Sequence, residues 1–231
     1  MIPRARNELK KLLQMAFVLF GFTLVLGLAS MQWWDEALAS YFADPARLGL
    51  WQLARDITEI GLGQHYFIFV TIMAIALWLI APKIKYWIKF KKHIRWLKAW
   101  TINFFLALLF SGFWLHVFKW AFGRKRPHIQ PLFNAKEFYP FTHNWDYQSL
   151  PSGHAQVLFT VATMLFVLAP KGGRFWFKLA GFFAFTRVVV YAHFLSDVIF
   201  GAYVGAISTL VLLYMMKKTK FGITERLGDL K

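Results

Sequence analysis

Long apolar stretches alternate with short polar segments along most of the chain. A membrane-spanning helix needs about 20 mostly apolar residues, and six stretches approach or reach that length. They predict an all-α, polytopic membrane protein with six transmembrane helices, at about residues 12–31, 65–82, 97–118, 154–170, 176–192 and 196–216. The fourth stretch is short, and the fifth carries Lys178 and Arg187 near its two ends.

The composition supports immersion in a membrane. The 231 residues are 58% hydrophobic and 19% aromatic, with a mean hydropathy of +0.45, whereas soluble domains are usually about 45–50% apolar. The length predicts a single domain, residues 1–231. The basic segment Met1–Gln14 precedes an apolar run of spanning length, which is typical of an uncleaved signal anchor. The absence of cysteine excludes disulfides and thiolate metal sites.

The charged residues predict an orientation. The side that holds Met1–Lys11 also receives residues 83–98, 171–178 and 217–231, and it carries 19 of the 27 Lys and Arg residues but 3 of the 11 acidic residues. The opposite side holds the other 8 basic and 8 acidic residues, so the first side carries the whole net charge of +16. The positive-inside rule places this side, with both chain ends, in the cytoplasm. A charge confined to one membrane face argues against a nucleic-acid partner.

Three polar islands lie on the opposite, outer side. In the first, Lys119 and Arg126 are seven residues apart, or two helical turns, and would share a face if the helix persisted that far. Gly123 and Pro127 predict that the helix ends between them. Two converging cations can hold one phosphate, and arginine does so through two parallel hydrogen bonds. The alternative is a juxtamembrane basic cluster with no ligand.

The second island is Pro151-Ser152-Gly153-His154, directly before an apolar run. Ser152 is predicted to cap a helix, and Gly153 permits close backbone approach. A helix N-terminus presents free N–H groups and can bind an anion. His154 is placed where it could give a proton to a leaving oxygen.

The third island contains Arg187, His193 and Asp197 beside apolar residues. Ionisable groups at membrane depth are costly and usually functional. The i,i+4 spacing predicts His193 and Asp197 on one helix face, where the carboxylate would fix the imidazole tautomer and free the other ring nitrogen to attack. The alternatives are a helix-pairing network, or a metal held by His193, Asp197 and His154. The three nearby cations argue against a metal ion.

The connection 119–153 is long, aromatic and rich in proline. Long connections are usually functional or disordered, and this composition argues against disorder. We expect a short interfacial helix or a lid, which could accommodate a bulky headgroup.

In order, the three islands resemble the motifs of the type 2 phosphatidic acid phosphatase (PAP2) family, Lys-x6-Arg-Pro, Pro-Ser-Gly-His and Ser-Arg-x5-His-x3-Asp. The chain has Lys119-x6-Arg126-Pro127, Pro151–His154 and Thr186-Arg187-x5-His193-x3-Asp197. Thr186 replaces the family serine but keeps a hydroxyl. The motifs span residues 119–197, and the six-helix pattern extends the resemblance over the chain.

The resemblance implies a lipid phosphate or diphosphate phosphatase of a bacterial inner membrane, with a periplasmic active site and neither metal nor cofactor. His193 would be the nucleophile that forms a phosphohistidine, Asp197 would orient it, and His154 would act as acid and base. The phosphate oxygens would be held by Lys119, Arg126, Ser152, Gly153 and Arg187.

Several substrates and classes remain open at this point. Undecaprenyl diphosphate, phosphatidylglycerophosphate and phosphatidate are the leading candidates; a lipid A phosphatase or a lipid-to-lipid phosphotransferase would use the same residues. A vanadate-binding haloperoxidase shares the motifs but is soluble. A non-catalytic lipid-binding or transport protein would not need both histidines and the aspartate. No oligomeric state is predicted.

Overall fold

The described part of the chain folds into helices joined by turns and short 3₁₀ segments. The computed structural model describes residues 2–83, 90–129, 133–217, 219 and 222–223. Within them, one isolated antiparallel bridge between Arg124 and Phe138 is the only β-type pairing, so the predicted all-α class is confirmed. The α-helices are α1 (Ile2–Trp33), α2 (Asp35–Ala43), α3 (Leu48–Thr58), α4 (Gly63–Ile75), α5 (Lys91–Phe122), α6 (Gly153–Leu168), α7 (Gly173–Val189) and α8 (Leu195–Met216).

Several of these helices can cross a membrane. Among the described residues, four segments are long and apolar enough to span: Lys10–Trp33, Pro45–Lys83, Lys91–Phe122 and Leu195–Met216. Helix α6 is apolar but shorter. The protein is therefore a multi-pass membrane protein, while the count of six spans stays a prediction. The basic segments 83–98 and 217–231, predicted to be cytoplasmic, lie partly outside the described residues.

Two features of the helices differ from the sequence-based expectation. The segment between the first two predicted spans forms helices α2 and α3, which the hydropathy pattern does not indicate. Helix α7 ends at Val189, three residues earlier than predicted. The chain turns there, and Tyr191 adopts a positive φ of 38°, a conformation that cannot continue a right-handed helix.

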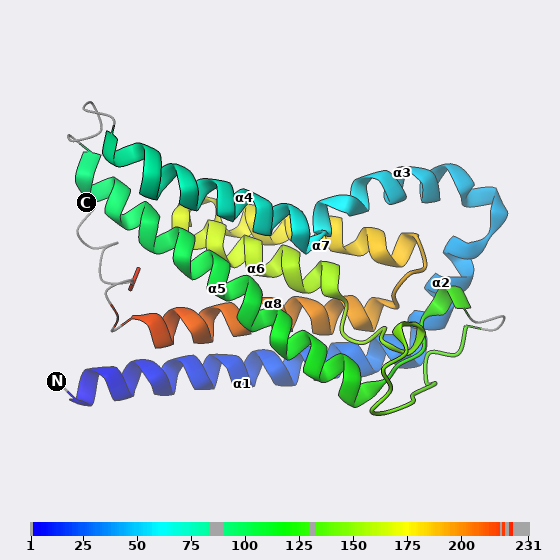
Figure 1. Cartoon of the computed structure of the whole chain (residues 1–231). Helices are drawn as coiled ribbons and strands as arrows, with labels where there is room; N and C mark the ends of the chain where they lie inside the picture. Colours follow the sequence, from blue (N-terminus) through cyan, green and yellow to red (C-terminus); the bar gives the residue numbers. More distant parts are fainter. Residues whose placement is uncertain (1, 84–89, 130–132, 218, 220–221, 224–231) are drawn as a thin grey trace.

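The long helices lie side by side and form a bundle, with helix termini gathered at its two ends (Figure 1). Helix α1 begins and α8 ends at one end of the molecule. At the other end, α5 and α7 finish, α6 and α8 begin, and the described parts of the connection 123–152 fold beside α2. All three polar islands therefore meet at the same end of the bundle.

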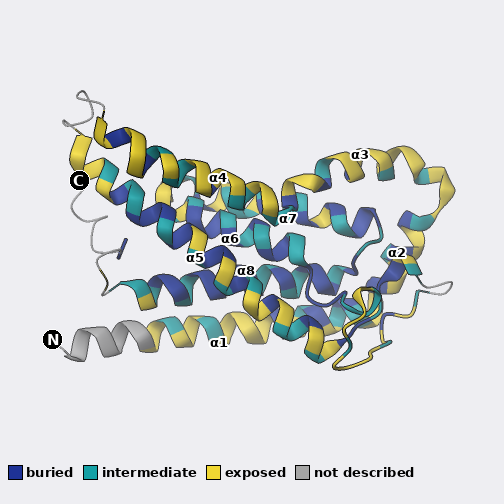
Figure 2. Ribbon diagram, in the orientation of Figure 1, coloured by how far each residue is buried: buried dark blue, intermediate teal, exposed yellow. Residues whose placement is uncertain are grey.

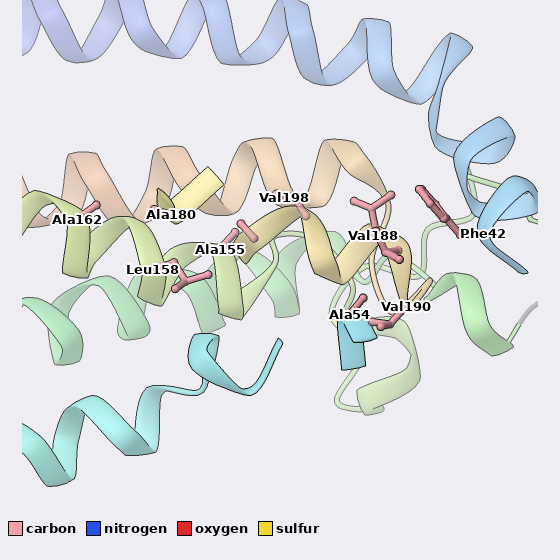
Figure 3. Packing of buried hydrophobic residues seen from close by; sticks show 11 residues of the cluster. Phe42, Ala54, Ala155, Leu158, Ala162, Ala180, Val188, Val190 and Val198 are labelled. Carbon is pink, nitrogen blue, oxygen red and sulfur yellow. The ribbon is translucent and has the colours of Figure 1, made fainter. Parts of the chain in front are cut away.

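Exposed apolar side chains cover the outside of the bundle, most clearly along α1 and α4 (Figure 2), as expected for lipid-facing helices. Inside, one hydrophobic cluster joins α2, α3, α6, α7 and α8 (Figure 3). Helices α6 and α8 approach closely because α8 presents glycines: a Cβ at Gly201 would lie 2.4 Å from the Ser152 carbonyl oxygen, and one at Gly205 would lie 2.2 Å from that of Gln156. Small residues permit such contacts between membrane helices. This contact sets the second island against the third.

Candidate active site

The first island is built by a sharp chain reversal at the end of α5. Gly123 is left-handed (φ 59°, ψ 42°), and its N–H donates to the Lys119 carbonyl. A Cβ at Gly123 would lie 1.7 Å from the Tyr139 carbonyl oxygen, so only glycine fits this position. Arg126 consequently lies beyond the end of the helix, so the condition under which it would share a helical face with Lys119 is not met.

Lys119 and Arg126 nevertheless converge. Lys119 Nζ and Arg126 Nη2 both donate to the Gln148 carbonyl, the latter at 3.3 Å. Arg126 Nε donates to the Trp145 carbonyl at 3.1 Å, and its Cζ lies 4.3 Å from the Trp145 ring centroid. The two cations are buried, 2% and 3% exposed. Burial lowers the pKa of Arg126 to about 10, so its guanidinium remains charged at neutral pH.

The second island lies at the start of α6, as predicted. Ser152 is the N-cap residue, but its side chain makes no capping hydrogen bond. Its Oγ is buried and has no partner among the described residues. Gly153 begins the helix, where the first N–H groups have no intrahelical acceptor. The Ser152 N–H donates to the Asp197 carbonyl at 2.9 Å, which ties this island to α8.

The third island is a turn between α7 and α8. Arg187 lies in the last turn of α7, and its carbonyl accepts from the N–H groups of Ala192 and His193 at 3.1 and 3.2 Å. His193 precedes α8, whereas Asp197 lies in the first turn of α8. The prediction that the pair shares one helix face is therefore wrong, although the two side chains do meet.

A serine stands between these two side chains. His193 Nδ1 lies 3.6 Å from Asp197 Oδ2. The Ser149 hydroxyl donates to Asp197 Oδ2 at 2.5 Å and lies 3.3 Å from Nδ1. Because the serine proton goes to the carboxylate, the Ser149 oxygen can accept from Nδ1–H, with the Asp197 oxygen just beyond hydrogen-bond distance. This arrangement favours the tautomer with a bare Nε2, and Arg126 Nη1 lies 3.4 Å from that nitrogen.

His193 is held in its neutral form. Burial lowers the pKa of His193 well below its ordinary value of 6.5. Four nearby positive charges lower this pKa further, those of Arg126, Lys119, Arg187 and His154. These four side chains come from all three islands, so the structure brings predicted site residues of each island together around His193.

Arg187 carries a donor that none of the described residues accepts from. Its Nη1 donates to Thr58 Oγ1 at 3.3 Å, and its buried Nε has no partner among the described residues. The neighbouring Thr186 hydroxyl also bonds Thr58, at 2.9 Å, and the Phe183 carbonyl. The threonine that replaces the family serine thus secures the α7–α3 contact.

The three cations Lys119, Arg126 and Arg187 have no carboxylate partner. No Asp or Glu oxygen of the described residues lies within salt-bridge distance of them.

His154 lies in the first turn of α6 and packs against Gly61. A residue larger than glycine would not fit at position 61, because its Cβ would lie 2.7 Å from the His154 imidazole. Across the described chain, no three His, Asp or Glu side chains form a metal-binding group.

Sequence reasoning missed several side chains and carbonyls of the site. Ser149, the Gln148 carbonyl, the Trp145 ring and Arg124 all contact predicted site residues. One signal was present in the sequence: in an extended segment, alternate residues point the same way, so Arg124 accompanies Arg126 inward. The connection itself forms 3₁₀ turns at Pro127–Ile129 and Trp145–Tyr147, and its described part contains no α-helix of the kind expected.

Two curated relatives are similar to part of this chain. A lipid A 1-phosphatase of Rhizobium johnstonii is 32% identical over 114 residues, and one of Rhizobium etli is 31% identical over 113 residues. Each match covers 49% of this chain and 46% or 47% of the relative, so the chain spans about half the length of the curated relatives it matches.

The fold also resembles a solved structure. The crystal structure of a transmembrane PAP2 type phosphatidylglycerolphosphate phosphatase from Bacillus subtilis aligns with a TM-score of 0.56 and 18% identity, over 88% of this chain and 96% of that one. The family model described as PAP2 superfamily matches residues 100–221, more than half of the chain, and includes all three islands. The chain belongs to the PAP2 superfamily.

Proposed function

We propose that the protein is an integral-membrane phosphatase that hydrolyses a phosphomonoester or diphosphate of a membrane lipid. The observation that carries this proposal is a set of three cations around a neutral His193, none of which has a carboxylate partner among the described residues. Two buried polar atoms of the site, Ser152 Oγ and Arg187 Nε, also have no partner among the described residues. A transferring phosphoryl group spreads negative charge over several oxygens, and fixed donors of this kind stabilise it.

The reaction would proceed in two steps. His193 Nε2 attacks phosphorus, the bond from phosphorus to the leaving oxygen breaks, and His154 gives that oxygen its proton. Water then attacks the phosphohistidine while His154 takes a proton from the water, which releases phosphate and restores both histidines. Asp197, with the Ser149 hydroxyl, holds Nδ1–H and compensates the charge that develops on the imidazole. Donors for the non-bridging oxygens are supplied by Lys119, Arg126, Arg187, Ser152 and the Gly153 N–H.

We further propose that residues 1–231 act as one domain in a bacterial inner membrane, with both chain ends cytoplasmic and the site periplasmic. The charge distribution supports this orientation, because segments rich in Lys and Arg lie on the side opposite the polar islands. A reporter fused after Lys231 is expected to show cytoplasmic activity. A periplasmic signal would reverse the orientation.

The lipid attached to the phosphate is the least constrained part of the proposal. Undecaprenyl diphosphate, phosphatidylglycerophosphate and phosphatidate remain the leading substrates. Lipid A is the second candidate, since two relatives are named lipid A 1-phosphatase. A panel of these lipids with purified protein separates them by released inorganic phosphate. Phosphate that appears on an added lipid acceptor instead would identify a phosphotransferase.

The central experiment is His193→Ala, assayed for phosphate release in detergent. Removal of a covalent nucleophile is expected to lower kcat by at least about 10³-fold. The matched control is His143→Ala, because His143 is exposed on the same outer connection and makes none of the site contacts described above. A folded His193→Ala protein with normal turnover would contradict the mechanism.

A further inference from the structure

A second buried arginine stands behind the nucleophile, and no predicted role accounts for it. Arg124 is fully buried, and its guanidinium lies between two carboxylates that are also fully buried. Nη1 donates to Asp197 Oδ1 at 2.5 Å, and Nη2 donates to Asp35 Oδ2 at 2.8 Å. Nε and Nη2 also donate to the Ala135 carbonyl, at 3.0 and 2.6 Å. This geometry leaves the guanidinium little freedom to move.

The two oxygens of Asp197 have different partners. Oδ1 accepts from Arg124, whereas Oδ2 accepts from the Ser149 hydroxyl and from the Phe194 N–H and faces His193 Nδ1. Rotation of the carboxylate would break the Arg124 bond. Arg124 therefore fixes the plane of the Asp197 carboxylate and the angle at which its other oxygen faces the imidazole.

Asp35 fixes the far side of Arg124. It lies at the start of α2 and accepts from the Ser30 hydroxyl at 2.6 Å, and from the Ser196 N–H and hydroxyl at 3.0 and 2.5 Å. Ser196 directly precedes Asp197 in α8. The α2 carboxylate thus holds both Arg124 and the backbone that carries the orienting aspartate, although Asp35 lies outside the 100–221 region that matches the family model.

The net charge of Arg124, Asp35 and Asp197 also favours a role for this cluster in the reaction. Two buried carboxylates and one arginine leave one net negative charge, and buried charges are tolerated only when they are paired and hydrogen-bonded. A positive charge on His193 would complete the balance when phosphoryl transfer makes the imidazole cationic. The cluster is therefore suited to the intermediate as well as to the resting site.

We infer that Arg124 and Asp35 are positioning residues for the reaction at His193, and that they act through Asp197. The inference rests on the proposed function. It assigns a role in the reaction to helix α2, in a part of the chain that none of the three motifs includes.

The experiment uses the full chain and compares Arg124→Lys and Asp35→Asn, alone and combined with Asp197→Asn. Lysine keeps the charge but cannot bond both carboxylates in the same fork geometry. Asparagine keeps the shape and one acceptor oxygen. In the wild-type background each change is expected to lower kcat about 10- to 100-fold, the usual effect of losing a group that orients a reacting ligand, with KM nearly unchanged.

The Asp197→Asn background separates positioning from folding. If both residues act through Asp197, Arg124→Lys and Asp35→Asn should have little further effect on kcat there, because coupled residues are not additive. Equal fold-losses in both backgrounds would show a general structural role and overturn the inference. Thermal unfolding in detergent identifies any variant that is not folded, and Asp35→Asn, which keeps the side chain's shape, serves as the milder probe.

Failure of the proposed function would look different. In that case the wild type would release no phosphate from any lipid of the panel, or His193→Ala would be fully active. If His193 and Asp197 prove essential while Asp35→Asn and Arg124→Lys retain wild-type kcat, the proposed function stands and only the positioning role is wrong.

Discussion

Two clusters of positive charge, both largely buried, lie at the end of the bundle where α6 and α8 begin, and they have opposite surroundings. Arg124 is enclosed by two carboxylates and a carbonyl, and all of its bonds are to the protein. Lys119, Arg126 and Arg187 donate to carbonyls or a hydroxyl, but they have no carboxylate partner among the described residues. Burial alone therefore does not identify a ligand-binding cation, whereas the lack of a carboxylate partner does.

The contrast follows from electrostatics. A cation paired with buried carboxylates stabilises the fold, and removing one partner of such a pair typically costs about 3–5 kcal/mol. Cations that face one another without counter-charges repel, so they destabilise the protein until an anion binds. We therefore call the first group the paired cluster, Arg124 with Asp35 and Asp197. The second, Lys119, Arg126 and Arg187, is the phosphate cradle.

The largest expected effect that tests this contrast is at Arg187. Loss of one preorganised donor lowers kcat/KM by about 10²–10³-fold, so Arg187→Gln should nearly abolish phosphate release. The same change should leave the unfolding temperature unchanged or higher, because it removes one of three repelling charges. Initial rates and thermal unfolding in the same detergent give both numbers. A variant that loses stability in step with activity would place Arg187 with the paired cluster.

The next effect concerns pH. The pKa of His193 is lowered, so the neutral nucleophile persists as pH falls below 6.5 and is lost only when pH falls through the lowered value. The acid limb of kcat/KM, which reports the free enzyme, should accordingly lie below pH 6.5. Arg187 is one cause of the lowered pKa. Its replacement by glutamine should raise the pKa of His193 and move that limb upward.

A limb that stays in place in Arg187→Gln would mean that this arginine is not close enough to His193 to affect its charge. Arg124→Lys makes a useful companion, since it keeps the positive charge of the paired cluster. Its pH profile should keep the wild-type midpoint even though its rate falls. The pair of profiles then distinguishes a change of charge from a change of orientation.

The smallest effect, and the control for both clusters, is expected at Lys125. This residue lies between Arg124 and Arg126 in sequence, but its Nζ reaches outward to Glu137 at 3.0 Å. Partly exposed ion pairs contribute little to stability. Lys125→Ala should match the wild type in rate and in unfolding temperature, and a large loss would show that basic charge in this segment acts without regard to direction.

Much of this arrangement could be predicted from the sequence. The long helices can be located from the sequence because a spanning helix is a continuous run of apolar residues. The residues Lys119, His154, His193 and Asp197 could be identified because ionisable groups beside such runs are rare, and because their motif spacing resembles a known family. Their proximity, however, does not follow from their spacing in the sequence.

Local spacing could not predict how these side chains meet. Gly123 ends α5 before Arg126, and α8 begins at Leu195, after His193, so neither pair lies on one helix. The paired cluster was beyond reach for a different reason: Asp35 and Arg124 are 89 residues apart, and no periodicity connects them. Contacts of that kind depend on the tertiary packing of α2 against the bundle.

The bond between Asp35 and Ser196 has a consequence for the order of events during synthesis. It joins residues 161 positions apart, so the ribosome delivers Asp35 into the membrane long before its partners in α8 exist. A nascent chain therefore carries the motif lysine and arginine without a correctly aimed nucleophile. Catalytic competence should appear abruptly, when the last helix is inserted, and incomplete translation products should be inert toward the lipids that surround them.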